Sequence, residues 1–237
     1  MTDKLNDKLI DEEETREQTF DLLSHIVLSR HSIRRFTSNP VPPSLLTSCL
    51  SLAQHAPSNS NIQNWRLHLA TDTARDRIVS ALSSHATTHG PNIPPIPPKF
   101  IHYRSAFGQI LYGPRGYNIP RAEKSAHREA QLRNFSFFDA PVVGVITQDQ
   151  SLGLVDALCV GLYINTLILA LTARGLGSCL QISVTGFPEV LREEFRLDDE
   201  QDILCGIAIG WPDRRDSIND LHVPREDVGH CVRILEE

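Results

Sequence analysis

Leu152 to Ala173, LGLVDALCVGLYINTLILALTA, is the most apolar stretch of the 237-residue chain. A helix of about 20 apolar residues is long enough to cross a bilayer. However, Asp156 and Asn165 interrupt the stretch, no basic cluster marks one of its ends, and strand-like segments follow it directly. A helix that is apolar on nearly every side is also typical of a large core or of a subunit contact. We therefore expect the central helix of a soluble protein that has no membrane partner.

Short apolar runs rich in β-branched residues lie on both sides of this helix. Strands are predicted over residues 65–71, 141–147, 177–183 and 202–210. Helices are predicted over residues 15–29, 44–55, 73–84, 103–112 and 120–135, and from residue 187 onward. Because no internal repeat or linker divides the chain, the pattern favours a single α+β domain over residues 15–237.

Two segments differ from this compact pattern. Residues 1–24 hold eight acidic side chains against three basic ones, and we expect residues 1–14 to form a flexible acidic arm. Residues 85–102 contain five prolines and one glycine. That composition is typical of an exposed lid or linker, and we expect a lid or insertion around residues 85–135.

Charge, cysteine content and missing motifs exclude several classes of protein. The formal net charge is −6, and most of it lies in the N-terminal arm, so no broad basic face for nucleic acid is expected. The first residues contain no apolar leader. The five cysteines are far apart and form no C-x-x-C pair, which indicates reduced thiols in a cytoplasmic protein and no metal site. No H-E-x-x-H or G-x-S-x-G motif occurs.

A basic cluster, Arg30-His31-Ser32-Ile33-Arg34-Arg35-Phe36, follows the first predicted helix. Arginine binds phosphate oxygens through a forked pair of hydrogen bonds, and a serine hydroxyl or backbone N–H groups can add further donors. The cluster therefore has the chemistry of an anion site. A solvated basic turn between two helices is the other interpretation, and these residues alone leave both open.

Two further segments carry polar or glycine-rich patterns. Residues 56–65, APSNSNIQNW, offer mixed donors and acceptors that suit the polar edge of a heterocycle, although a simple turn would have the same composition. Gly175-Leu176-Gly177-Ser178 lacks the third glycine of a dinucleotide fingerprint and follows a predicted helix rather than a strand. This second pattern argues against a Rossmann domain.

Taken together, these motifs closely resemble the nitroreductase family of FMN-dependent flavoproteins, and in particular its branch of nitrobenzoate-type reductases. The resemblance covers about Ser24 to Ile234, in order. Its motifs are Arg30–Arg34, Pro57–Trp65, Tyr103–Ser105, Asn134–Pro141, Arg174–Gln181, Pro188–Glu193, Gly206–Asp213 and Asn219 with Arg225.

The resemblance implies an α+β nitroreductase-like fold, with a mainly antiparallel central sheet flanked by helices. It also implies an intertwined homodimer with two FMN sites at the subunit interface, in which the long apolar helix packs on its mate. The residues implied to bind FMN are Arg30, His31, Ser32, Ile33, Arg34, Ser58, Asn61, Gln63, Gln181, Ile182, Ser183 and Arg225.

Their implied roles differ. Arg30, Ser32, Arg34 and Arg225 would hold the phosphate and ribityl end, with His31 and Ile33 lining the same segment. Ser58, Asn61 and Gln63 would reach FMN from the other subunit. The backbone at 181–183 would lie near N5 and the pyrimidine edge of the flavin.

The implied activity is an oxidoreductase in which NADH or NADPH reduces FMN, and FMN then reduces a flat acceptor such as a nitroaromatic or a quinone, in a ping-pong cycle. The flavin carries the redox chemistry, so no catalytic acid or nucleophile is required. Phe107 and Tyr112 of the lid are candidate substrate contacts, with ordinary packing as the alternative.

Two departures from the family pattern keep other functions open. Asn64 stands where proline is common before the tryptophan, and Asp220 stands where a basic residue is common. The unusual lid separately leaves an FMN enzyme that desaturates or reduces one natural product as an alternative, whereas Asn64 and Asp220 bear on the next one. A flavin-binding protein without enzymatic activity is the alternative from another class.

Overall fold

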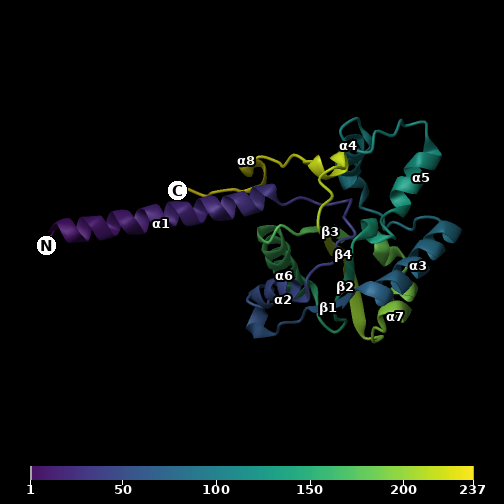
Figure 1. Ribbon diagram of the computed structural model, residues 1–237, viewed down its shortest axis with the longest axis horizontal. Helices are drawn as coiled ribbons and strands as arrows, with labels where there is room; N and C mark the ends of the chain where they lie inside the picture. The colour runs from purple at the N-terminus through teal and green to yellow at the C-terminus, as the bar shows by residue number, and fades with distance from the viewer. Residues whose placement is uncertain (1, 237) are drawn as a thin grey trace.

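A four-stranded antiparallel sheet forms the centre of the protein in the computed structural model, which describes the backbone of residues 2–236 and the side chains of residues 13–236. The strand order is β1-β2-β4-β3 (Figure 1). The strands are β1 (Arg66–Ala70), β2 (Val142–Asp149), β3 (Gly177–Gln181) and β4 (Gln201–Gly210). All three strand pairings are antiparallel, which confirms the expected sheet.

Helices cover both faces of this sheet. They are α1 (Thr2–Ser29), α2 (Pro43–Ala53), α3 (Asp72–His89), α4 (Ile101–Tyr112), α5 (Lys124–Leu132), α6 (Leu154–Ala173), α7 (Pro188–Phe195) and α8 (Val228–Cys231). Figure 1 shows α2 and α6 on one side of the sheet, α3 and α7 on the other, and α4 with α5 at one end. The lid region therefore lies beside the sheet rather than within the core.

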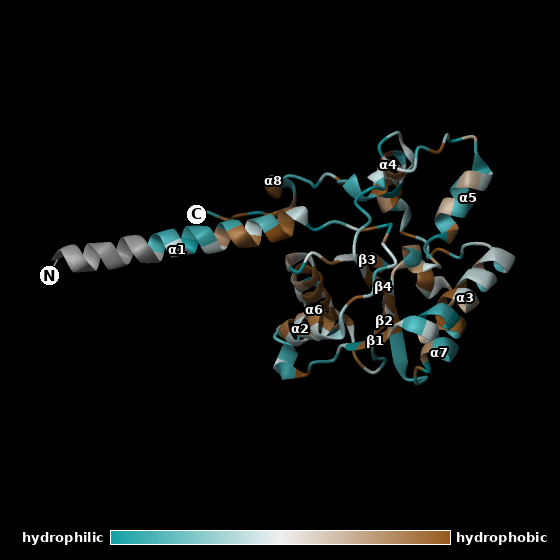
Figure 2. Cartoon of the chain, in the orientation of Figure 1, coloured by the Kyte–Doolittle hydropathy of each residue, from teal (hydrophilic) through white to brown (hydrophobic). Residues whose placement is uncertain are grey.

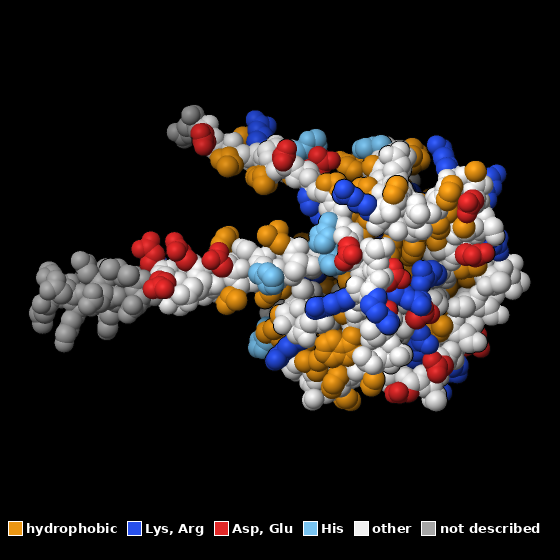
Figure 3. All heavy atoms as spheres, turned by 45° about the horizontal axis from the view of Figure 1, so that its top comes forward, with side chains coloured by type: hydrophobic (Ala, Val, Ile, Leu, Met, Phe, Trp, Pro, Cys, Tyr) orange, Lys and Arg blue, Asp and Glu red, His pale blue; other side chains and the backbone are white. Residues whose placement is uncertain are grey.

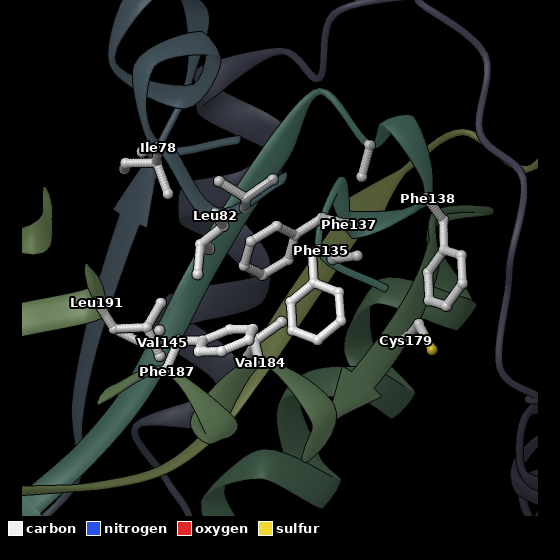
Figure 4. Close-up of a cluster of buried hydrophobic side chains, with 14 of the residues drawn as sticks. Ile78, Leu82, Phe135, Phe137, Phe138, Val145, Cys179, Val184, Phe187 and Leu191 are labelled. Atoms are coloured by element: carbon white, nitrogen blue, oxygen red, sulfur yellow. The ribbon is translucent and has the colours of Figure 1, made fainter. Parts of the chain in front are cut away.

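The two central strands, β2 and β4, are buried on both faces because helices cover each face of the sheet. Successive side chains of a strand point to opposite faces and therefore enter different clusters. Val142 and Ile146 of β2 join the cluster under α2 and α6, whereas Val143 and Val145 join the cluster under α3 and α7. Figure 4 shows part of the second cluster, where Phe135 and Phe137 pack among side chains from the helices and the sheet. This alternation explains why β2 is an almost continuous apolar run.

Helix α6 is buried on only part of its surface within one chain. Val160, Leu167 and Leu171 are fully buried in the cluster shared with α2, whereas Leu154 and Leu158 are exposed. Among the described residues, α6 is the only helix long and apolar enough to cross a membrane. Its buried face makes it a core helix. Burial on every side is therefore wrong for the single chain, because Leu154 and Leu158 in the N-terminal half of α6 are exposed in it.

Several predicted boundaries are corrected by the structure. Helix α1 begins at Thr2 rather than at Thr15, because the acidic segment contains no proline or glycine to stop a helix; its flexibility stays a prediction. Helix α3 runs to His89, and Gly90, at φ 84°, ends it. The segment expected to lack regular structure is therefore shorter, and it ends where the 3₁₀ turn Pro98–Phe100 leads into α4.

The two ends of the chain project from the same side of the body. Figure 1 shows the long helix α1 and the C-terminal tail leaving the body in the same direction, and the rotated view in Figure 3 shows them apart. Figure 2 shows apolar residues along the half of α1 nearer the body. Phe20, Leu23, Ile234 and Leu235 are exposed. The C-terminal tail, residues 224–236, is exposed throughout and has little contact within its own chain.

Candidate functional site

The basic segment after α1 lies directly along the edge strand β3. The backbone N–H of Ile33 donates to the carbonyl of Ser178 at 3.0 Å, and that of Thr37 donates to Trp211 at 2.9 Å. Gly177 permits this approach, because a Cβ atom there would lie 2.5 Å from Cγ1 of Ile33. The segment is therefore an ordered extension of the sheet edge. The interpretation as a solvated turn is wrong.

A single buried side chain, Asn219, fixes the backbone of this segment. Its Oδ1 accepts the N–H groups of Arg34 at 2.8 Å and of Arg35 at 3.2 Å. Its Nδ2 donates to the carbonyls of Arg35 at 2.7 Å and of Asp213 at 3.0 Å. Because one side-chain amide makes all four hydrogen bonds, Asn219 joins the basic segment to the turn after β4.

Arg30 and Arg225 are brought together from opposite ends of the chain. Burial of the Arg30 guanidinium lowers its pKa, and the neighbouring charge of Arg225 lowers it further. Ser32 and Arg34 lie near the same group. Burial raises the pKa of the Cys179 thiol, whereas the charge of Arg34, the Ser32 hydroxyl and the charge of Arg30 lower it. Two guanidinium groups whose charges act on each other are suited to a phosphate, although Asp220 lines the same pocket as Arg30.

A cavity of about 630 Å³ opens beside this cluster, between the lid and the end of β3. This volume lies in the usual range for small-molecule sites, roughly 300–1,000 Å³. None of the described side chains that line the cavity is acidic. Of the predicted residues, it brings together Arg34, Phe107, Tyr112, Gln181, Ile182 and Ser183.

The polar wall of the cavity is organised around Asn134. Gln181 Nε2 donates to the carbonyl of Asn134 at 2.7 Å, and the Ser183 hydroxyl donates to Asn134 Oδ1 at 2.9 Å. Gln181 Oε1 is buried and has no partner among the described residues. Buried acceptors are rarely unpaired, so this oxygen calls for a ligand with an N–H donor. The pyrimidine ring of FMN has such a group, and the cavity therefore fits a flavin.

The lid contributes aromatic side chains to the same cavity. The guanidinium carbon of Arg34 lies 5.4 Å from the centre of the Phe107 ring, within the range of a cation–π contact. Burial raises the pKa of Tyr112, which also packs edge-on against His127 at 4.3 Å. Phe107 therefore packs against Arg34, which is expected to contact the flavin, and it also lines the cavity.

The predicted residues that do not line this cavity are Arg30, His31, Ser32, Ile33, Ser58, Asn61, Gln63 and Arg225. Ser58, Asn61 and Gln63 belong to an exposed loop that is hydrogen-bonded to itself: Gln63 N donates to Ser58 Oγ at 3.1 Å, and its amide donates to the Asn61 carbonyl. None of the three lines the cavity. The ring nitrogens of His31 contact the carbonyls of Ser29 and Asn219, so this side chain supports the segment.

Residue patterns alone did not single out Asn134, Asn219, Cys179 or Tyr117, all of which the structure places at the site. Asn134, Cys179 and Asn219 stand inside the family-like motifs, and this was their only signal. Tyr117 lies outside every motif, and nothing in the sequence pointed to it. Among the side chains of residues 13–236, no cluster of three His, Cys, Asp or Glu is suited to a metal ion.

Comparison with known proteins agrees with this geometry. The model of the nitroreductase family matches residues 27–211. The chain belongs to the nitroreductase family. This result confirms the resemblance seen in the motifs.

Relatives of this nitroreductase-family protein match over most of its length. A 4-nitrobenzoate reductase of Pseudomonas putida is 31% identical over an alignment of 208 residues. The alignment covers 85% of this chain and 90% of the relative. A nitrobenzene nitroreductase of Ectopseudomonas oleovorans is 29% identical over 92% of this chain and 99% of its own. The FMN-dependent nitroreductase NfnB of Mycobacterium smegmatis, solved with NADPH, superposes with a TM-score of 0.84 at 27% identity, covering 92% and 100% of the two chains. The expected fold is confirmed.

Proposed function

We propose that this protein is an FMN-dependent oxidoreductase that passes electrons from NADH or NADPH to nitroaromatics, quinones or similar flat acceptors. The observation that carries the proposal is the lid cavity, which Arg34 lines and in which Gln181 Oε1 lacks a donor; the neighbouring charges of Arg30 and Arg225 support it. The names of the relatives, two of which reduce nitroaromatics, support the same activity. When bound, FMN supplies the redox chemistry.

The chain's own residues then have distinct tasks. Arg30 and Arg225 bind the phosphate, and Ser32 with Arg34 holds the ribityl end. Gln181 Oε1 accepts a hydrogen bond from the flavin ring, beside the backbone of Ile182 and Ser183. The lid, with Phe107 and Tyr112, covers the acceptor and limits its contact with water.

A second copy of the chain completes the site in this proposal. Ser58, Asn61 and Gln63 lie on an exposed loop whose Asn59 N–H bonds the Cys159 thiol of α6 at 3.3 Å. The exposed apolar side chains gather on α1, on the N-terminal half of α6 near that loop, and on the tail. Leu154, for example, is 89% exposed. An exposed apolar surface of this extent is typical of a subunit interface. An intertwined homodimer would bury it and bring each loop to its partner's flavin.

The first experiment tests cofactor binding. The purified protein is incubated with FMN, desalted, and examined by absorbance and by sedimentation. The proposal predicts one flavin per chain in a dimer. A protein that is folded and yet retains no flavin would overturn it.

The second experiment tests the reaction. Under anaerobic conditions, NADH and NADPH are mixed separately with the flavin-loaded protein, and the loss of flavin absorbance is followed. 4-Nitrobenzoate, nitrobenzene or a quinone should then restore the absorbance. Flavin that neither nucleotide bleaches would contradict the proposed use of NAD(P)H and favour action on one specific metabolite. We place the protein in the cytoplasm, where its five thiols remain reduced.

A further inference from the structure

Tyr117 lies in the loop between α4 and α5 and lines the lid cavity, although no predicted role includes it. Its hydroxyl is buried and has no hydrogen-bond partner among the described residues. Buried hydroxyl groups are nearly always paired, and leaving one unpaired is costly. Because Gln181 Oε1 is unpaired in the same cavity, Tyr117 is the second buried polar group there that lacks a partner.

The ring of Tyr117 lies near one side chain at the end of α4 and one directly after α5. The Arg133 guanidinium lies 5.7 Å from the ring centre, and the ring of Tyr112 lies 6.1 Å away. Side chains packed in this way lose little freedom when a ligand binds. The hydroxyl is therefore a preorganised group rather than a mobile one.

The chemistry of the pocket makes this hydroxyl a donor. Burial raises the pKa of Tyr117, and the positive charges of Arg133 and Arg34 only partly oppose that effect. The phenol therefore keeps its proton at neutral pH. Because no carboxylate is found among the described residues that line the cavity, no acidic side chain competes for the hydrogen bond.

We propose that the Tyr117 hydroxyl donates a hydrogen bond to an oxygen atom of the flat acceptor, such as a nitro or quinone oxygen, and so orients the acceptor in the cavity. This inference rests on the proposed function. When the acceptor is reduced and the cofactor oxidised, the acceptor oxygen gains negative charge, which a fixed donor stabilises. Tyr117 keeps its own proton throughout: two electrons and one hydrogen would come from the reduced cofactor as hydride, the second proton would come from water, and a nitro oxygen that is lost would leave as water.

Binding to the oxidised, FMN-loaded protein gives the first test, because this form has no electrons to transfer. Calorimetry compares 4-nitrobenzoate with 4-methylbenzoate, which keeps the ring and the carboxylate but has no nitro oxygen. Tyr117→Phe should weaken the binding of 4-nitrobenzoate about two- to fivefold and leave 4-methylbenzoate unchanged. Equal weakening of both ligands, or no change for either, would overturn the inference.

Kinetics give the second test. Tyr117→Phe should slow the oxidation of the reduced protein by 4-nitrobenzoate about tenfold. Its reduction by NAD(P)H and its oxidation by ferricyanide, which needs no bound oxygen atom, should be unchanged. Tyr163→Phe is the matched control, since Tyr163 is also buried but stacks on Trp65 and lies outside the cavity.

Two further results distinguish acceptor binding by Tyr117 from a purely structural role. Because the hydroxyl has no partner among the described residues, flavin-free Tyr117→Phe should melt at the same temperature as the unaltered protein or higher. A large drop in melting temperature, or weaker FMN binding, would contradict the role assigned here. Failure of the unaltered protein to bind FMN would instead refute the proposed function.

Discussion

Asn219 Oδ1 accepts a hydrogen bond of 2.8 Å from the backbone N–H of Arg34, a residue 185 positions away in the chain. The same amide also bonds the backbone of Arg35 and Asp213, so one buried side chain joins the basic segment Arg30–Phe36 to the turn after β4. In the proposed site, the backbone of Arg34 is therefore held by a residue that carries no charge and that touches the segment only through its backbone.

Replacing Asn219 by alanine should lower the free energy of unfolding by about 1–3 kcal/mol, because it leaves buried backbone groups without partners. FMN affinity should fall as well, since Arg34 loses its anchor. Urea denaturation and flavin titration measure the two effects. Asn39→Ala, at an exposed position before α2, is the comparison variant. Unchanged stability in Asn219→Ala would show that the segment is held in another way.

Arg30→Ala and Arg225→Ala should each weaken FMN binding about tenfold or more, because a hydrogen bond to a charged group contributes roughly 1.5–3 kcal/mol. The double variant should lose the flavin on desalting. Riboflavin, which lacks the phosphate, should bind the unaltered protein, the two single variants and the double variant equally weakly. Arg196→Asn removes a charge at the end of α7 and serves as the control. Stoichiometric flavin in the double variant would disprove the phosphate assignment.

Leu158→Asp should convert the expected dimer into monomers, because it places a charge on the exposed apolar face of α6. The monomer should also bind FMN weakly, since no second chain would supply the loop with Ser58 and Asn61 to its site. Sedimentation and flavin titration test the two statements. Thr73→Asp, at an exposed position of α3, adds the same charge away from that face. A monomeric unaltered protein that binds FMN tightly would refute the shared site.

Of the five cysteines, only Cys231 should react quickly with a thiol reagent in the folded protein. Cys49, Cys159, Cys179 and Cys205 are buried, whereas Cys231 is exposed. Burial also raises the pKa of Cys205 to about 12, so little of it is thiolate, the reactive form, at neutral pH. Titration with a chromogenic disulfide should count one thiol in buffer and five in denaturant. Fast labelling of two or more thiols would contradict the packing.

The sequence predicted the elements of the fold well where a local pattern was strong. The apolar runs at 141–147 and 202–210 became β2 and β4, because buried central strands are apolar on both faces. Boundaries were less accurate where helix propensity alone decided them. Helix α1 extends thirteen residues further toward the N-terminus than expected, since nothing in the acidic segment interrupts a helix.

For the candidate site, the sequence determined the residue types and their order: an arginine-rich segment, a polar loop, a glycine-rich strand and a late arginine. These features depend only on local chemistry and on the resemblance that they carry. Only the tertiary structure decided which of them meet. Chain folding brings Arg30 to Arg225 and Asn219 to Arg34, while Ser58, Asn61 and Gln63 stay apart from them in one chain. Tyr117 shows the same limit, because an unpaired hydroxyl is a property of its surroundings and of no local pattern.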